Sequence, residues 1–76
     1  GIRINAVLPG AVRTPMLTER AFVQNPGYEQ FAGQAHPLGR MAEPAEIAEA
    51  AAWLLSDRAS FVTGIGLPVD GGMTAQ

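Results

Sequence analysis

Ser60, Asp70 and His36 are polar side chains whose chemistry could serve catalysis. A serine nucleophile needs a base, and the G-x-S-x-G turn that exposes such a serine is absent around Ser60. Asp70 comes directly before Gly71-Gly72, which favours a turn-capping role over that of a carboxylate base. His36 is the only histidine and lies in a proline-containing loop, where a surface or hinge position is favoured over catalysis.

A stronger candidate site uses the backbone. The apolar run at residues 2–8 ends abruptly at Pro9-Gly10, and glycine allows a backbone to approach a flat ligand closely. Thr14 precedes Pro15, which is the pattern of a helix N-cap followed by proline at the first helical position. The stretch from Pro9 to Thr14 is therefore the candidate binding segment.

The elements that must position this segment follow from the hydrophobic pattern. Residues 2–8 are nearly continuously apolar, as a buried parallel strand is. Pro44 and Glu46 begin the strongest helix, expected at about 44–55, and a last strand is expected at about 65–69. Pro68 favours an edge position for that strand. The intervening residues 14–41 far exceed the roughly 2–6 residues of a usual βα loop, which is typical of a lid.

The order strand, helix, strand predicts one right-handed βαβ crossover of an α/β protein. Two strands do not make a stable parallel sheet, and both faces of such a sheet need cover. We therefore expect one βαβ portion of a doubly wound domain whose remainder is missing, in a sequence cut from something longer. Ligands of such sheets bind outside the carboxyl ends of the strands, which places the expected site at Pro9-Gly10.

Composition narrows the function classes. The chain has 76 residues, a net charge of −2 and no cysteine, so disulfides and thiolate zinc sites are excluded and no metal site is expected. A basic footprint for nucleic acid is absent. The longest apolar run, residues 50–55, is far shorter than the ~20 residues that span a bilayer. With no visible signal peptide, we expect a cytoplasmic protein without a membrane partner.

At this point the residues resemble a known family, the classical short-chain dehydrogenases/reductases (SDR family). The resemblance covers the whole chain and implies that it is the C-terminal βαβ portion of a single Rossmann-type doubly wound domain. It is carried by four motifs in order: residues 1–7 followed by Pro9-Gly10-x-Val12-x-Thr14, Leu38-Gly39-Arg40 with the Pro44–Ala48 helix start, the 56–64 segment and Val69-Asp70-Gly71-Gly72.

The resemblance implies a nicotinamide cofactor, NAD or NADP. Pro9 and Gly10 would lie beside the nicotinamide ring, and the backbone of Val12 would hydrogen-bond its carboxamide. Thr14 would bond the carboxamide or the pyrophosphate. An amide ligand needs one donor and one acceptor, which a backbone residue can supply.

Residues 14–41 would be the substrate lid, with Met16, Leu17 and Phe22 as apolar pocket residues suited to a carbon-rich alcohol or ketone. Arg40 is expected to anchor this loop by an ion pair or through a backbone carbonyl. The family's glycine-rich phosphate turn and its Tyr-x-x-x-Lys pair are absent, and Tyr28 is not followed by that lysine. No catalytic residue is therefore expected in these 76 residues, which alone would be inactive.

The resulting hypothesis is an NAD(P)-dependent oxidoreductase that transfers hydride between the cofactor and a secondary alcohol or ketone. This segment would supply the nicotinamide-side loop, the lid and the interface of a homo-oligomer, a tetramer or dimer. The alternative is a non-catalytic proteolytic or truncated fragment that persists through self-association. The sequence does not choose between NAD and NADP, nor does it name the substrate or the direction of reaction.

Overall fold

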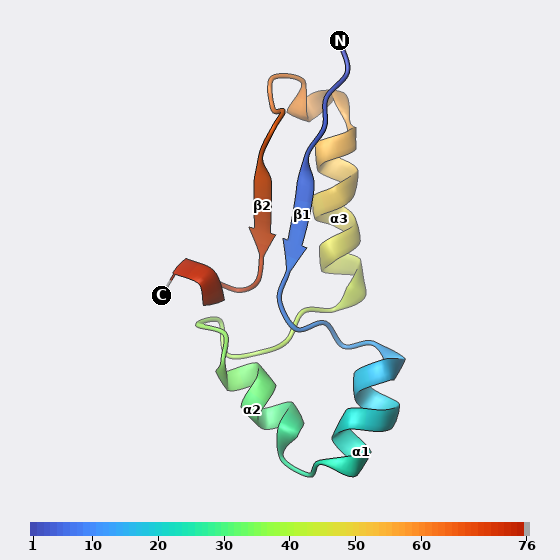
Figure 1. Cartoon of the computed structure of the whole chain (residues 1–76), viewed down its shortest axis with the longest axis vertical. Coiled ribbons are helices and arrows are strands. Elements are labelled where there is room, and N and C mark those ends of the chain that lie inside the picture. Colours follow the sequence, from blue (N-terminus) through green and yellow to red (C-terminus); the bar gives the residue numbers. More distant parts are fainter. Residues whose placement is uncertain (76) are drawn as a thin grey trace.

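The computed structural model describes residues 1–75, with the side chains of all of them except Met16, Ala21 and Phe22. The chain is elongated, with extents of 48 × 26 × 15 Å, and falls into two halves (Figure 1). The strand–helix half contains β1 (Ala6–Pro9), α3 (Pro44–Leu55) and β2 (Gly66–Val69). The other half, residues 14–41, is called the lid half here after the role expected from the sequence. It contains a π-helical segment (Met16–Ala21), α1 (Phe22–Gln24) and α2 (Tyr28–Gln34).

The two strands form a parallel pair, as the crossover predicts, with Ala6 opposite Gly66 and Pro9 opposite Val69. The ladder is shorter than the apolar run of residues 2–8. Before Ala6 the chain meets the turn that precedes β2, and the Gly64 N–H donates to the Ile4 carbonyl at 2.8 Å. Beyond Pro9 the ladder gains one more bond, from the Gly10 N–H to the Val69 carbonyl at 3.0 Å.

Helix α3 begins and ends with specific caps. Glu43 is the N-cap, Pro44 follows it, and the Glu46 side chain accepts from the Glu43 N–H at 2.9 Å. At the other end the Ser56 hydroxyl donates to the Trp53 carbonyl at 2.7 Å and accepts from the Arg58 N–H, which opens a short 3₁₀ turn at Asp57–Ala59. The helix lies alongside β1 (Figure 1).

Arg3 joins the start of the chain to the end of α3. Its guanidinium donates to the carbonyls of Leu54 at 2.8 Å, Ser56 at 3.1 Å and Val62 at 3.2 Å. The last carbonyls of a helix have no partner within the helix, so this side chain satisfies groups that otherwise need water. Asn5 closes the same corner, because its amide donates to the Val62 carbonyl and accepts from the Ile65 N–H.

In the lid half, the helical segment begins at Pro15, but the described hydrogen bonds at its start use the Thr14 carbonyl, which accepts from the N–H groups of Leu17 and Thr18. The N-cap bond expected from the Thr14 side chain is not among them. In α2, Ala32 is buried, whereas Phe31 is 69% exposed. A last 3₁₀ turn, Met73–Ala75, ends the described chain, and none of the described helices is long and apolar enough to cross a membrane.

Candidate functional site

The loop that follows β1, residues 10–13, is the centre of the candidate site and is called the elbow loop here. It is held at both ends by backbone bonds: Gly10 to β2, and Arg13 by donation of its N–H to the Ala42 carbonyl at 2.9 Å. Between them the Ala11 carbonyl accepts from the Ala42 N–H at 2.9 Å. The Ala11 N–H donates to Nε2 of His36 at 3.1 Å. The loop is thus fixed from the strand side, the α3 side and the lid side.

Val12 presents its backbone away from these partners. Val12 and Ala42 form an isolated parallel bridge in which Ala42 bonds the residues on either side of Val12. Successive residues of an extended chain direct their N–H and C=O groups to opposite edges, so those of Val12 point away from Ala42. Among the residues that the structure describes, no partner is found for either group. One donor and one acceptor are therefore left side by side, which is what a planar carboxamide requires.

Gly10 is needed for close packing. A Cβ at this position would lie 2.7 Å from Nε2 of His36 and 3.0 Å from Cα of Asp70. Both separations are shorter than van der Waals contact, and the Gly10 φ is not in the left-handed region. The sequence suggests that glycine here allows close approach to a flat ligand. In the structure, atoms of the protein itself already occupy the space that a side chain at position 10 would fill.

His36 does not have the surface position expected from the sequence. Its side chain is buried, with the residue only 4% exposed, and both ring nitrogens are engaged. Nε2 accepts from the Ala11 N–H, which leaves the proton on Nδ1, and Nδ1 donates to the Ala32 carbonyl of α2 at 2.8 Å. His36 is buried because α2 ends next to the elbow loop, so its side chain lies between the helix and the loop.

The remaining predicted site residues lie in β1, directly after the elbow loop, or in the helical segments of the lid half. Pro9 lies in the last pair of the strand ladder, and Thr14 is half-buried where the lid half begins. Leu17 is half-buried in the π-helical segment. The side chains of Met16 and Phe22, the other two predicted pocket residues, lie outside those that the structure describes.

Two arginines tie the lid half to its surroundings. Arg13 of the elbow loop forms an ion pair with Glu29 of α2, and its Nε lies 3.7 Å from a carboxylate oxygen of Glu43. The hydrogen bond and charge of Glu29 raise the pKa of Arg13. Arg40, expected to anchor its loop, binds both oxygens of Glu46 at 2.7 and 2.9 Å and the Met41 carbonyl at 3.2 Å. The Arg40 hydrogen bond, aided by that of the Glu43 N–H, lowers the pKa of Glu46 to about 2.

Asp70 caps the turn after β2, as its position before two glycines indicates. One carboxylate oxygen accepts from the Gly72 N–H at 3.1 Å, and the other accepts from the N–H and hydroxyl of Thr74 at 3.2 and 2.7 Å. The Thr74 hydrogen bond outweighs burial and lowers the pKa of this carboxyl group. All of its bonds serve the turn, so a role as a catalytic base is not supported.

A pocket of about 420 Å³ lies at the carboxyl ends of both strands. Gly10, His36, Val69 and Asp70 are among its lining residues. Gly10 is the only one of the four predicted cofactor residues that lines it, so this pocket is not the place where Val12 and Thr14 would meet a ligand. Within residues 1–75 no three acidic or histidine side chains gather in a way that could hold a metal ion.

With this geometry established, comparison with known proteins decides the family. The profile of a family described as enoyl-(acyl carrier protein) reductase matches residues 1–74. A solved oxidoreductase of the short-chain dehydrogenase/reductase family from Burkholderia thailandensis superposes with a TM-score of 0.92 at 43% identity, over 100% of this chain and 30% of that one. The chain belongs to the short-chain dehydrogenase/reductase family.

Curated relatives of this SDR chain carry names of enzymes. It is 60% identical over 75 residues to the 2,5-dichloro-2,5-cyclohexadiene-1,4-diol dehydrogenase of Sphingobium indicum, covering 99% of this chain and 30% of that protein. It is 58% identical over 74 residues to the A-factor type gamma-butyrolactone 1'-reductase (1S-forming) of Streptomyces virginiae, covering 97% and 28%. The chain thus spans less than a third of the length of these oxidoreductases.

Sequence reasoning missed two residues of the site, His36 and Arg13. The contact between His36 and Ala11 joins positions 25 residues apart, and no short motif signals it. The one available signal was that a lone histidine stands between an amphipathic helix and a proline. Arg13 adjoins the predicted cofactor residues, but its partner Glu29 lies in a different predicted helix.

Proposed function

We propose that the protein carrying this segment is an NAD(P)-dependent dehydrogenase or reductase that interconverts a secondary alcohol and a ketone. In this proposal the elbow loop binds the nicotinamide end of the cofactor. Residues 14–41 cover the substrate. The observation that carries the proposal is the outward-facing donor and acceptor of Val12, held beside Pro9 and Gly10 at the carboxyl ends of two parallel strands.

The residues present fit a nicotinamide. Its carboxamide offers one N–H donor side and one carbonyl acceptor, and Val12 presents the complementary pair of groups on a loop fixed from three sides. Thr14 stands two residues further along the chain, directly after the elbow loop, with a hydroxyl that can reach the carboxamide or a phosphate oxygen. When bound, the nicotinamide would supply the hydride acceptor or donor that alcohol oxidation or ketone reduction requires.

This chain's own residues would orient the cofactor and exclude water. A rigid loop that presents a preformed donor and acceptor fixes which ring face is turned toward the substrate. The apolar residues Met16, Leu17 and Phe22 give the lid a composition suited to a carbon-rich substrate. The two relatives named above are called a cyclohexadiene-diol dehydrogenase and a gamma-butyrolactone reductase, and both names are consistent with the interconversion of an alcohol and a ketone.

The test uses the full-length protein and two threonine variants. Binding of NADH and NADPH is followed by nucleotide fluorescence, and turnover is measured with NAD⁺ or NADP⁺ and cyclohexanol as a probe alcohol. We expect Thr14→Val to weaken dinucleotide binding about tenfold, because a hydrogen bond to a polar ligand group is lost. Thr18→Val is the matched control, since the one described bond of the Thr18 hydroxyl is to the Thr14 carbonyl within the helical segment, and this variant should bind as the wild type does. Failure of the wild-type protein to bind either dinucleotide would refute the proposal.

A second candidate function rests on exposed apolar side chains. Ile2 is 91% exposed, Leu55 84% and Phe61 101%, so the strand–helix half leaves an apolar surface open. A non-catalytic piece of this sequence could persist by covering that surface with a second copy. The mass of the purified native protein separates the two: a chain near 8.0 kDa that self-associates and binds no dinucleotide supports this candidate over the enzyme.

A further inference from the structure

Building on the proposed function, we infer that His36 is a positioning residue for the nicotinamide site. It holds the amide of Ala11, which precedes Val12, and it ties that amide to helix α2 of the lid. In this arrangement the imidazole sets where the Val12 donor and acceptor point, without itself touching the cofactor.

The ring forms a continuous hydrogen-bonded link. The Ala11 N–H donates to Nε2 at 3.1 Å, and Nδ1 donates to the Ala32 carbonyl at 2.8 Å. This arrangement requires the neutral ring with its proton on Nδ1, because a doubly protonated imidazole has no acceptor for the Ala11 N–H. The residue is 4% exposed, so water does not readily replace either bond.

The link has little freedom to move. The space between Gly10 and the imidazole is too small even for a methyl group, since a Cβ on Gly10 would lie 2.7 Å from Nε2. The segment that carries His36 is fixed again where the Leu38 N–H donates to the Gly71 carbonyl at 3.2 Å. A shift of α2 therefore has to move the ring, and a shift of the ring has to move the elbow loop.

In this role His36 supplies a hydrogen-bond acceptor at the position of Nε2, and this requirement distinguishes the role from general packing. A glutamine at position 36 can place its carbonyl oxygen near the position of Nε2, whereas an asparagine reaches only as far as Nδ1. The two amides are alike in polarity and differ in reach. His36→Gln should therefore preserve the bond to Ala11 and His36→Asn should lose it.

The experiment measures hydrogen exchange of the individual Ala11 and Val12 amides in the full-length protein, first without nucleotide and then with NADH or NADPH. Dissociation constants for the same dinucleotides are measured in parallel. We expect His36→Asn to accelerate exchange at Ala11 about tenfold and to weaken dinucleotide binding by a similar factor. His36→Gln should remain within about threefold of the wild type in both measurements. Gln34→Ala, which removes an exposed side chain of the same helix, is the control and should change neither.

Two results would overturn the inference: equal exchange at Ala11 in the asparagine variant and the wild type, or faster exchange without weaker binding. Should the asparagine variant not fold, the wild type alone decides, because without nucleotide its Ala11 amide must exchange more slowly than its Val12 amide. Absence of dinucleotide binding in every variant, the wild type included, would instead defeat the proposed function. The Ala11 exchange rates would still report on the bond to His36.

Discussion

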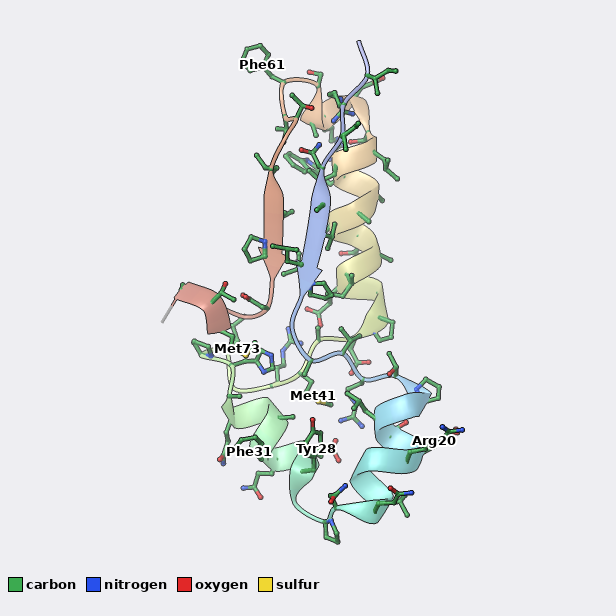
Figure 2. All side chains as sticks on the ribbon, viewed as in Figure 1. Arg20, Tyr28, Phe31, Met41, Phe61 and Met73 are labelled. Atoms are coloured by element: carbon green, nitrogen blue, oxygen red, sulfur yellow. The ribbon has the colours of Figure 1, made fainter. Side chains whose placement is uncertain are left out.

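The two strands of the strand–helix half are joined through backbone groups, whereas helix α2 of the lid half is attached to the elbow loop through side chains. Strands β1 and β2 share a ladder, and even the Arg3 side chain acts on backbone carbonyls of α3 and the turn beyond it. Helix α2 instead reaches the elbow loop through the Arg13–Glu29 ion pair and the His36 ring. Figure 2 shows Tyr28 and Met41 on the inner side of the lid half and Arg20 directed outward from it.

The difference has consequences for function. Backbone ladders depend little on which side chains are present, so the strand–helix half can keep one geometry in spite of sequence change. Side-chain ties can be altered one at a time, and local opening of such a region costs less than global unfolding. We therefore expect residues 14–41 to open locally while the ladder between β1 and β2 stays intact.

The largest effect is expected at Gly10, where the two halves meet. Gly10→Ala places a methyl group 2.7 Å from His36 Nε2 and 3.0 Å from the Asp70 backbone, so we expect a loss of about 3 kcal/mol in the free energy of unfolding of the full-length protein. Urea unfolding measures it. Gly33→Ala is the control, since the nearest atoms lie at 3.6 Å and a helical alanine is favoured over glycine. Equal stability of the two variants would show that the junction is not tightly packed.

A smaller effect is expected at Arg3 in the strand–helix half. A lysine ammonium cannot reach three carbonyls on different sides, so Arg3→Lys should lower the free energy of unfolding by about 2 kcal/mol. The exposed Arg58, whose side chain has no described hydrogen bond, offers the matched control Arg58→Lys, with an expected change within about 0.5 kcal/mol. If the two variants unfold at the same denaturant concentration, the end of α3 does not depend on the guanidinium.

Arg13 tests the lid half. Arg13→Gln removes the ion pair to Glu29, and we expect amide exchange in α2 to become a few-fold faster while exchange in α3 is unchanged. High salt should produce the same selective change in the wild type, because the pair is partly exposed and therefore screened. The exposed Arg20 supplies the control Arg20→Gln. Faster exchange in both helices would mean that the two halves do not open independently.

The sequence predicts most of the strand–helix half because its signals are local. Pro44 with Glu46 identifies a helix start, two glycines after Asp70 identify a turn, and the crossover fixes the parallel pairing. The first strand is shorter than its apolar run because the residues before Ala6 meet the turn that precedes β2. The Arg3 and Asn5 side chains and a backbone bond to Ile4 hold them there. Whether a residue pairs in the ladder depends on which segment lies beside it in the folded chain, and the hydrophobic pattern of one segment does not give that information.

The candidate site was predictable only in part, for the same reason. The family resemblance selects Pro9, Gly10, Val12 and Thr14. These residues lie close together in the sequence, within positions 9–14, so their proximity is given by the chain itself. Their roles toward a nicotinamide remain proposals. The burial of His36 comes from the docking of α2 against the elbow loop, a long-range contact without a sequence signature. A lone histidine beside proline fits an exposed loop equally well until that docking is known.

The smallest effect concerns the Arg40–Glu46 pair, which lies where the lid half returns to α3. Because the folded-state pKa of Glu46 is lowered from 4.5 to about 2, the pair adds stability above pH 4.5 that is lost as the pH falls toward 2. Arg40→Gln should therefore make the free energy of unfolding less dependent on pH in that window. Near neutral pH the difference should be small, because both side chains are half-exposed.

The double variant Arg40→Gln/Glu46→Gln tests whether this dependence comes from the pair. Urea unfolding of all four proteins at several pH values below 4.5 gives the slopes. If Arg40→Gln removes as much of the dependence as Glu46→Gln does, and the double variant removes no more than either, the pair accounts for the whole effect. An equally steep slope in Arg40→Gln and the wild type would instead assign the low pKa of Glu46 to the Glu43 N–H, which donates to its carboxylate. The return of residues 14–41 to α3 would then depend on the backbone cap of the helix and not on a side-chain pair.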